Sequence, residues 1–211
     1  MHQQRLPMSV QSNWTWFLLA LAPAVASQIL RMGETDPQAW LAWDYAGRLG
    51  TLAVLAVIPA ARIIAFAREA RTVRWLELAI WVACLLAFEL IIGRSITSIM
   101  DAAIPGTRLT TPSNPRGWLY AVDVTFGIAL VAYQEEVVFR RCARAVLSKT
   151  LSGRTTMVIA SALLFGSYHW SRGLGTITSA ALFGVVAMTF YLRAGVLWPL
   201  VLVHYVTDVM W

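Results

Sequence analysis

Residues 175–192 read GTITSAALFGVVAMTFYL, a run of apolar and small side chains that contains no charged residue. A helix rises about 1.5 Å per residue, so a run of this length nearly crosses a hydrocarbon core about 30 Å thick. Similar apolar runs recur along the whole chain. The sequence therefore predicts an all-α fold, a polytopic bundle of membrane-spanning helices.

The composition of the chain supports the same class. Of its 211 residues, 58% are hydrophobic and 13% are charged, and the mean hydropathy is +0.63. Soluble domains carry about 25% charged residues, so a soluble globular domain is excluded. The net charge of +6 is explained by basic loops beside the spans. The expected partners therefore include membrane lipid and no nucleic acid.

Turn and charge signals divide the chain into about seven spans, within a range of six to eight. The predicted spans are 13–31, 45–67, 75–93, 120–147, 155–170, 175–192 and 195–211. Residues 1–119 are predicted to form a three-span region, and residues 120–211 a four-span core, within one integral membrane domain. The first span is expected to be retained, because another span follows soon after it and only one basic residue precedes it.

The distribution of Lys and Arg predicts the orientation. With the N-terminus in the cytoplasm, 11 of the 17 basic residues lie inside, which favours a cytoplasmic N-terminus and an external C-terminus in the inner (plasma) membrane. The predicted inside residues are Arg5, Arg62, Arg68, Arg71, Arg74, Arg140, Arg141, Arg144, Lys149, Arg154 and Arg193. The predicted outside residues are Arg31, Arg48, Arg94, Arg108, Arg116 and Arg172. The loop 94–119 contains Pro105, Pro112 and Pro115 and is predicted to be external and irregular.

Small residues and cysteines are interpreted as packing features. Gly175 and Ser179, and likewise Ala180 and Gly184, lie four positions apart in one predicted span, which favours close helix packing. The two cysteines, Cys84 and Cys142, lie far apart without metal-ligand spacing. These features carry no prediction about activity.

Ionisable side chains inside spans cost several kcal/mol unless they are paired or wetted, so they are functional candidates. Most of them here lie in the second half of the chain, in three separate spans. The three groups are Glu135, Glu136 and Arg140; Phe165 and His169; and His204 and Asp208. Residues four apart share one helix face, which pairs Glu136 with Arg140, Phe165 with His169, and His204 with Asp208.

The depth of these side chains in the membrane agrees when the fourth span extends to residue 147. Glu135 then lies about 18 Å, His169 about 21 Å and His204 about 14 Å from the respective cytoplasmic helix ends. Arg140 is then partly buried, with Glu136 as its partner. A carboxylate and two imidazoles are therefore expected at one level.

Two kinds of chemistry fit this group. A buried carboxylate beside imidazoles fits general-base hydrolysis, whereas Glu and two His also fit zinc with a bound water, so a zinc site is not excluded. Structural alternatives stand beside both readings: Glu136 and Arg140 as an ion pair only, and the histidines as packing hydrogen-bond donors. Asp123 is expected either to bond a neighbouring helix or to face the outer interface.

Glu135-Glu136 with Arg140, Phe165 with His169, and His204 with Asp208 together resemble the CPBP family, which comprises CAAX prenyl endopeptidases and bacteriocin-processing proteases. The resemblance covers about residues 121–211. It implies a glutamate-dependent intramembrane endopeptidase without a required metal or other cofactor.

The resemblance also implies residue roles. Glu135 would be the general base, His169 would hold the water, and His204 with Asp208 would stabilise the oxyanion. Glu136 and Arg140 would brace the site, with Phe165 in support. The family's commonest pattern has Asn where this chain has Asp208. An ionised Asp cannot donate a hydrogen bond, so Asp208 must either be protonated or orient His204.

Two other functions remain open at this stage. One is a non-proteolytic membrane scaffold, such as an immunity or sorting factor, on the same fold. The other is a proton-coupled transporter, against which stands the lack of an inverted repeat. For a protease, the expected substrate is a protein or peptide with a membrane-associated tail or leader. One Lys among 17 basic residues fits a GC-rich prokaryotic source, which favours a leader or sorting tail over a prenylated substrate.

Overall fold

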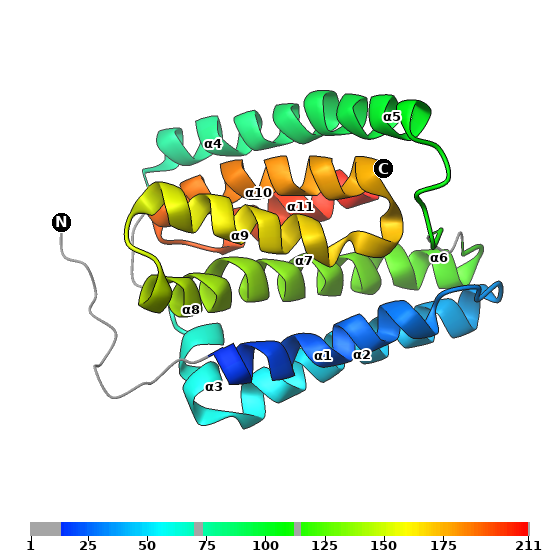
Figure 1. Cartoon of the computed structure of the whole chain (residues 1–211), viewed down its shortest axis with the longest axis horizontal. Coiled ribbons are helices and arrows are strands. Elements are labelled where there is room, and N and C mark those ends of the chain that lie inside the picture. Colours follow the sequence, from blue (N-terminus) through cyan, green and yellow to red (C-terminus); the bar gives the residue numbers. More distant parts are fainter. Residues whose placement is uncertain (1–13, 70–73, 112–114, 211) are drawn as a thin grey trace.

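The structure is a computed structural model that describes residues 14–69, 74–111 and 115–210. Throughout these ranges the chain forms helices and no strands, so the predicted all-α fold is confirmed (Figure 1). The predicted features at Arg5, Arg71 and Pro112, and the outer limits of the first and last spans at 13 and 211, lie outside the described residues.

Helices α1 (Trp14–Leu30) and α2 (Pro37–Val57) lie side by side along one edge of the molecule (Figure 1). The carboxylate of Asp36 caps α2 by accepting hydrogen bonds from the backbone N–H groups of Gln38 and Ala39, each at 3.2 Å. Pro37 occupies the first turn, where its missing N–H costs nothing. The helix therefore begins at Pro37, whereas the apolar pattern predicted a start at residue 45.

The second predicted span, 45–67, is not one straight helix. Helix α2 is followed by α3 (Pro59–Ala65), and the two are bent by 111° relative to each other. Pro59 has no N–H to continue the hydrogen-bond ladder of α2, but its fixed φ suits the first turn of a new helix. The expectation of a continuous span is wrong at this point.

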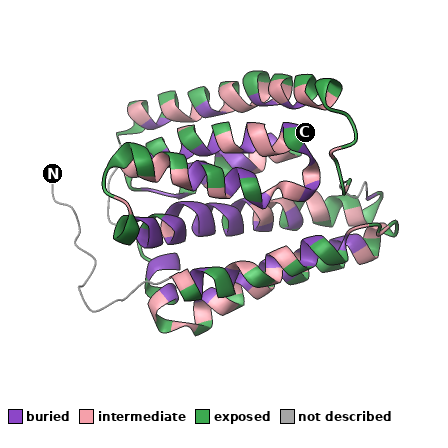
Figure 2. Ribbon diagram, in the orientation of Figure 1, coloured by how far each residue is buried: buried purple, intermediate pink, exposed green. Residues whose placement is uncertain are grey.

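The opposite edge of the molecule is one long helix, Trp75–Ala103, made of α4 (Trp75–Ala87), the π-helical turn η1 (Phe88–Gly93) and α5 (Arg94–Ala103). Much of its surface is exposed (Figure 2). Residues 94–103 were expected in an irregular loop, and that expectation is wrong. The apolar run in the sequence ends at these residues because several of them are polar. In the structure they still form a helix and contact α10, where the hydroxyl of Thr97 donates to Ser179 Oγ at 3.0 Å.

The centre of the molecule is a long helical stretch from Trp118 to Thr150, with α9 to α11 packed beside it (Figure 1). Its inner part is almost entirely buried (Figure 2). The stretch consists of α6 (Trp118–Val122), η2 (Asp123–Gly127), α7 (Ile128–Glu136), η3 (Val137–Cys142) and α8 (Ala143–Thr150). After it come α9 (Arg154–Tyr168), η4 (Trp170–Arg172), α10 (Leu174–Ala194) and α11 (Trp198–Met210).

Small residues let α10 approach its neighbours closely, as predicted. A Cβ added at Gly184 would lie 3.0 Å from the Cα of Ala162 in α9. One added at Gly175 would lie 2.7 Å from the carbonyl oxygen of Thr97 in α5. Any larger side chain at either position would push the helices apart.

The predicted number of seven spans is not confirmed. By length and composition, two described helices are suited to cross a membrane, Trp75–Ala103 and Leu174–Ala194, and the bent pair α2–α3 makes a third. Helix α1 is apolar but shorter. The central helix is not among these candidates for another reason: its middle carries the charged residues of the candidate site.

Candidate active site

Glu135 lies near the end of α7 and is 2% exposed. Its Oε1 accepts a hydrogen bond from Nη1 of Arg48 in α2 at 2.8 Å. Its Oε2 has no hydrogen-bond partner within the described part of the chain. Because a carboxylate oxygen carries two lone pairs, Oε2 is free to accept a proton from a nearby group.

Two imidazoles from two further helices face this oxygen. Nε2 of His169, at the end of α9, lies 3.7 Å from Glu135 Oε2, and Nε2 of His204, in α11, also lies 3.7 Å from it. These separations are slightly too long for direct hydrogen bonds, so the polar atoms are left to bind a water molecule that lies beside them. Helices α7, α9 and α11 therefore bring together the carboxylate and the two imidazoles that the sequence singled out.

The hydrogen bond of the other ring nitrogen determines the tautomer of His169. Its Nδ1 lies 2.9 Å from the carbonyl oxygen of Phe165. A carbonyl only accepts, so Nδ1 carries the hydrogen and donates it. The neutral ring then presents an unprotonated Nε2 to Glu135, which suits it to accept a hydrogen bond from a water molecule.

Glu136 and Arg140 form a buried pair behind His204. Arg140 donates from Nε to Glu136 Oε2 at 2.8 Å and from Nη2 to Oε1 at 3.2 Å. Both side chains are 0% exposed, so Arg140 is fully and not partly buried. Nδ1 of His204 lies 3.0 Å from Glu136 Oε1, to which it donates. The pair therefore fixes the imidazole ring of His204.

Phe165 and Asp208 complete the set expected from the sequence. The Phe165 ring lies under the Arg140 guanidinium at 4.7 Å, and its centroid is 4.9 Å from that of His169. Asp208 Oδ2 lies 3.6 Å from His204 Nε2, beyond hydrogen-bond distance. The Asp208 side chain is 34% exposed, more than any of the other charged or imidazole side chains of the set. The site therefore reaches the molecular surface beside Asp208.

Sequence reasoning missed the part of the site that comes from α1 and α2. Arg31 and Arg48 were assigned to the outside but are buried, at 8% and 4% exposure. Asp44 joins them, with ion pairs of 2.6 Å to Arg31 and 3.0 Å to Arg48. A signal was present: Asp44 and Arg48 are four positions apart beside an apolar stretch, like Glu136 and Arg140.

Asp123 lies outside this cluster. The hydroxyl of Tyr45 in α2 donates to Asp123 Oδ1 at 2.8 Å, so the first of the two alternatives, a bond to a neighbouring helix, is correct. The cysteines differ from each other. Cys142 is buried, which agrees with a packing role, whereas Cys84 is exposed and the packing interpretation is wrong for it.

The donor set does not fit a zinc ion. Among the described residues, no group of three or more His, Cys, Asp and Glu side chains is arranged to hold a metal. Glu135 Oε1 is engaged by the Arg48 guanidinium, and His204 Nδ1 is engaged by Glu136. A cation beside the central carboxylate is a poor neighbour for a divalent metal.

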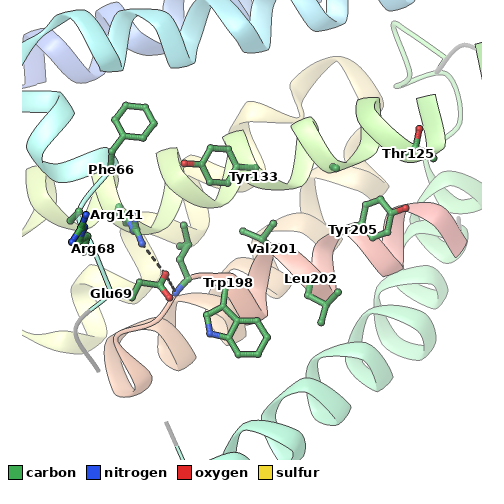
Figure 3. Close-up of a pocket in the computed structure, with 13 residues that line it drawn as sticks. Phe66, Arg68, Glu69, Thr125, Tyr133, Arg141, Trp198, Val201, Leu202 and Tyr205 are labelled. Carbon is green, nitrogen blue, oxygen red and sulfur yellow. Dashed lines mark hydrogen bonds and ion pairs between the residues drawn. The ribbon is translucent and has the colours of Figure 1, made fainter. Parts of the chain in front are cut away.

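A cavity of about 550 Å³ lies against α7 and α11 (Figure 3). Tyr133 of α7 lines it, and Glu135 is two positions further, about 200° around the helix axis. Other lining side chains include Val201 and Tyr205 of α11. At one end Arg141 is paired with Glu69 at 2.8 Å. None of Glu135, His169 and His204 lines the cavity.

An all-helical protein with a carboxylate and two imidazoles buried between three helices has the features of a membrane-embedded hydrolase. The comparison with known families agrees: residues 117–210 match the family model of type II CAAX prenyl endopeptidase Rce1-like proteins. This match covers α6 to α11 and confirms the resemblance to CPBP family intramembrane proteases. No curated protein and no solved structure matches the chain.

The matched family has general consequences for this chain. It is a protease family, which supports peptidase activity and a protein or peptide substrate. Together with the apolar helices, it also identifies a membrane protein. Residues 1–116, which include α1 to α5, lie outside the match.

Proposed function

We propose that the protein is an intramembrane endopeptidase that hydrolyses a peptide bond with a water molecule activated by Glu135. The observation that carries this proposal is the position of Glu135 Oε2, which faces Nε2 of His169 and Nε2 of His204 at 3.7 Å each. A water bound beside these atoms would donate one hydrogen bond to Oε2 and one to His169 Nε2.

The proposed reaction starts with proton transfer from this water to Glu135 Oε2. The resulting hydroxide attacks the scissile carbonyl carbon, and the carbonyl oxygen becomes an oxyanion. The proton on Glu135 then passes to the leaving amide nitrogen, and the C–N bond breaks. Such a general base contributes about 10²- to 10⁴-fold to the rate.

His204 is proposed to stabilise the oxyanion by donating from Nε2, which requires hydrogens on both ring nitrogens because Nδ1 donates to Glu136. One such donor contributes about 10²- to 10³-fold. A ring with both hydrogens is positively charged, so the Asp208 carboxylate, with Oδ2 at 3.6 Å from Nε2, is proposed to hold His204 in place by charge and not by a hydrogen bond. Glu136 and Arg140 are proposed to brace the ring from behind.

The proposed substrate is a protein or peptide with a membrane-associated tail or leader. The description of the matched family is that of a CAAX prenyl endopeptidase, so a prenylated terminus is one candidate tail. An exported protein's sorting tail and a leader peptide are the others. All three place a scissile bond beside an apolar anchor, next to a site buried among helices.

The test uses the purified protein in lipid nanodiscs and two fluorogenic probes. One probe is a farnesylated peptide ending in a CAAX sequence, and the other is a peptide with an apolar helical tail. We expect the wild type to cleave at least one probe. Glu135→Ala and His169→Ala should each lower kcat by about 100-fold or more while the protein stays folded.

The matched control is Glu77→Ala. Glu77 is also a helical glutamate paired with an arginine, but its pair with Arg193 is exposed and far along the chain from the site. Exposed pairs contribute little to stability, so this variant should cleave like the wild type. Cleavage of neither probe by the wild type, or normal cleavage by Glu135→Ala, would refute the proposed function.

A further inference from the structure

Arg48 contacts the candidate base from outside the part of the chain that matches the protease family. It lies in α2, whereas the match begins at residue 117. Its Nη1 donates to Glu135 Oε1 at 2.8 Å and to Gln134 Oε1 at 3.0 Å. The Arg48 side chain is 5% exposed and that of Glu135 is 3% exposed. The contact is therefore shielded from solvent.

The charges around Arg48 are balanced within the described residues. Asp44 holds Arg31 at 2.6 Å and Arg48 at 3.0 Å, and Arg48 in turn holds Glu135. Two cations and two carboxylates thus form one buried chain, from the turn directly after α1 to α7. Removal of one member of such a chain leaves an uncompensated charge in a low-dielectric interior. Glu135 is the end member, and Arg48 is the hydrogen-bond partner of its Oε1.

The same helix pair also holds the turn that carries His169. Gln28 of α1 donates from Nε2 to the carbonyl oxygen of Tyr168 at 3.0 Å. Its Oε1 accepts a hydrogen bond from Ser171 Oγ at 3.3 Å. These two contacts flank His169 on both sides in sequence. The backbone that places its imidazole is therefore fixed by α1.

Close packing of α1 on α2 places these side chains. A Cβ added at Gly47 would lie 3.0 Å from the carbonyl oxygen of Pro23, and one added at Gly50 would lie 2.9 Å from Pro23 Cβ. Gly47 directly precedes Arg48. The two glycines allow the helix approach that brings Arg31 within reach of Asp44.

We propose that α1 and α2 form the positioning half of the active site, with Arg48 as a positioning residue for Glu135 and Gln28 as a positioning residue for the His169 turn. This inference rests on the proposed function. Arg48 occupies Oε1, so the Glu135 carboxylate cannot rotate freely and Oε2 stays directed at the two imidazoles. The protease half alone, residues 117–210, lacks this restraint.

The first experiment compares Arg48→Gln and Arg48→Lys in nanodiscs, with the probe that the wild type cleaves. Arg48→Gln should lower kcat by about 10- to 100-fold, part of what a general base contributes. KM should change by less than about threefold, because Arg48 is buried behind Glu135. Arg48→Lys restores the charge but only one point of contact, so its kcat should lie between those of Arg48→Gln and the wild type.

Tyr45→Phe is the matched control for this experiment. It removes a hydrogen bond between α2 and η2, three positions before Arg48, without touching Glu135. Its kcat should stay within about twofold of the wild type. Wild-type kcat in Arg48→Gln, equal losses in the Gln and Lys variants, or a loss in Tyr45→Phe as large as in Arg48→Gln would overturn the proposal.

A second measurement separates this inference from the proposed function. Thermal unfolding midpoints are measured for four proteins, all in one detergent: the wild type, Arg48→Gln, Glu135→Gln and the double variant. The Arg48→Gln substitution should lower the midpoint by about 4 °C or more when it is made in the wild type. When it is made in the Glu135→Gln protein, the midpoint should fall by less than half as much. Additive shifts would overturn the positioning contact. If the shifts are coupled but the wild type cleaves neither probe, the proposed protease function is refuted and the positioning contact stands.

Discussion

Arg140 is a large side chain that is completely buried against Glu136 and the ring of Phe165. We expect Arg140→Ala to leave the Glu136 carboxylate buried without its cation, which costs about 3–5 kcal/mol. Protein abundance in the membrane and the unfolding midpoint should both fall, and activity should fall with them. Quantitative immunoblotting and thermal unfolding measure these effects.

Arg193→Ala is the control for this prediction. The Arg193 side chain is 66% exposed and pairs with Glu77 at 2.8 Å. An exposed pair contributes about 0–1 kcal/mol, so abundance should stay near that of the wild type. Normal abundance of Arg140→Ala would contradict the bracing role of the Glu136–Arg140 pair.

At the scale of single residues, the sequence singled out side chains of the second half that the structure brings together, and it missed those of the first half. Glu135, His169 and His204 stand out because each interrupts an apolar span with a group that is costly to bury. Arg48 was overlooked because α2 begins at Pro37, so that Arg48 seemed to lie close to the end of a span. Its contact with Glu135 joins positions 87 residues apart, which no local pattern reveals.

Helices α9 and α10 determine where His169 lies. A Cβ added at Gly166 would stand 2.7 Å from the carbonyl oxygen of Ile177 in α10, and equally far from Ala181 Cβ. We expect Gly166→Ala to force the helices apart at a cost of about 1–3 kcal/mol. His169, three residues later, would shift with α9. Both the unfolding midpoint and kcat should decrease.

Ser167→Ala is the control for this effect, because Ser167 is exposed on the same helix. This variant should match the wild type in both measurements. A Gly166→Ala protein with unchanged midpoint and unchanged kcat would show that close α9–α10 packing does not place His169.

The helix boundaries agreed with the apolar pattern of the sequence only where no proline and no polar helix face interrupted that pattern. The predicted span 155–170 corresponds to α9 (Arg154–Tyr168), and the predicted span 175–192 corresponds to α10 (Leu174–Ala194). The sharp bend before Pro59 and the continuation of helix to Ala103 escaped prediction. At the bend, the missing N–H of Pro59 ends α2. In the helix that continues to Ala103, the buried face is polar, and polar residues in the sequence predict a loop.

The orientation of the whole molecule stays a prediction. Arg31, Arg48 and Arg140 are buried and so do not count as loop charges, but 10 of the 14 remaining basic residues are still predicted on the cytoplasmic side. We expect Lys149 on the cytoplasmic side and Leu109 outside. Both residues are exposed, so each is suited to cysteine substitution.

Labelling with a membrane-impermeant maleimide measures this orientation. The substitutions Lys149→Cys and Leu109→Cys are made in a background with Cys84 and Cys142 replaced by Ala. Leu109→Cys should react in intact cells, and Lys149→Cys only after the membrane is permeabilised. The reverse pattern would show that the N-terminus faces outward.

The central claim is that Glu135 Oε2 takes the proton from the attacking water. The kcat of Glu135→Gln tests it most directly, because glutamine keeps the shape of the side chain and can still accept from Arg48, but its amide is not a base at neutral pH. We predict a kcat at least about 100-fold below that of the wild type, with a folded protein. A Glu135→Gln enzyme that cleaves as fast as the wild type would contradict the account.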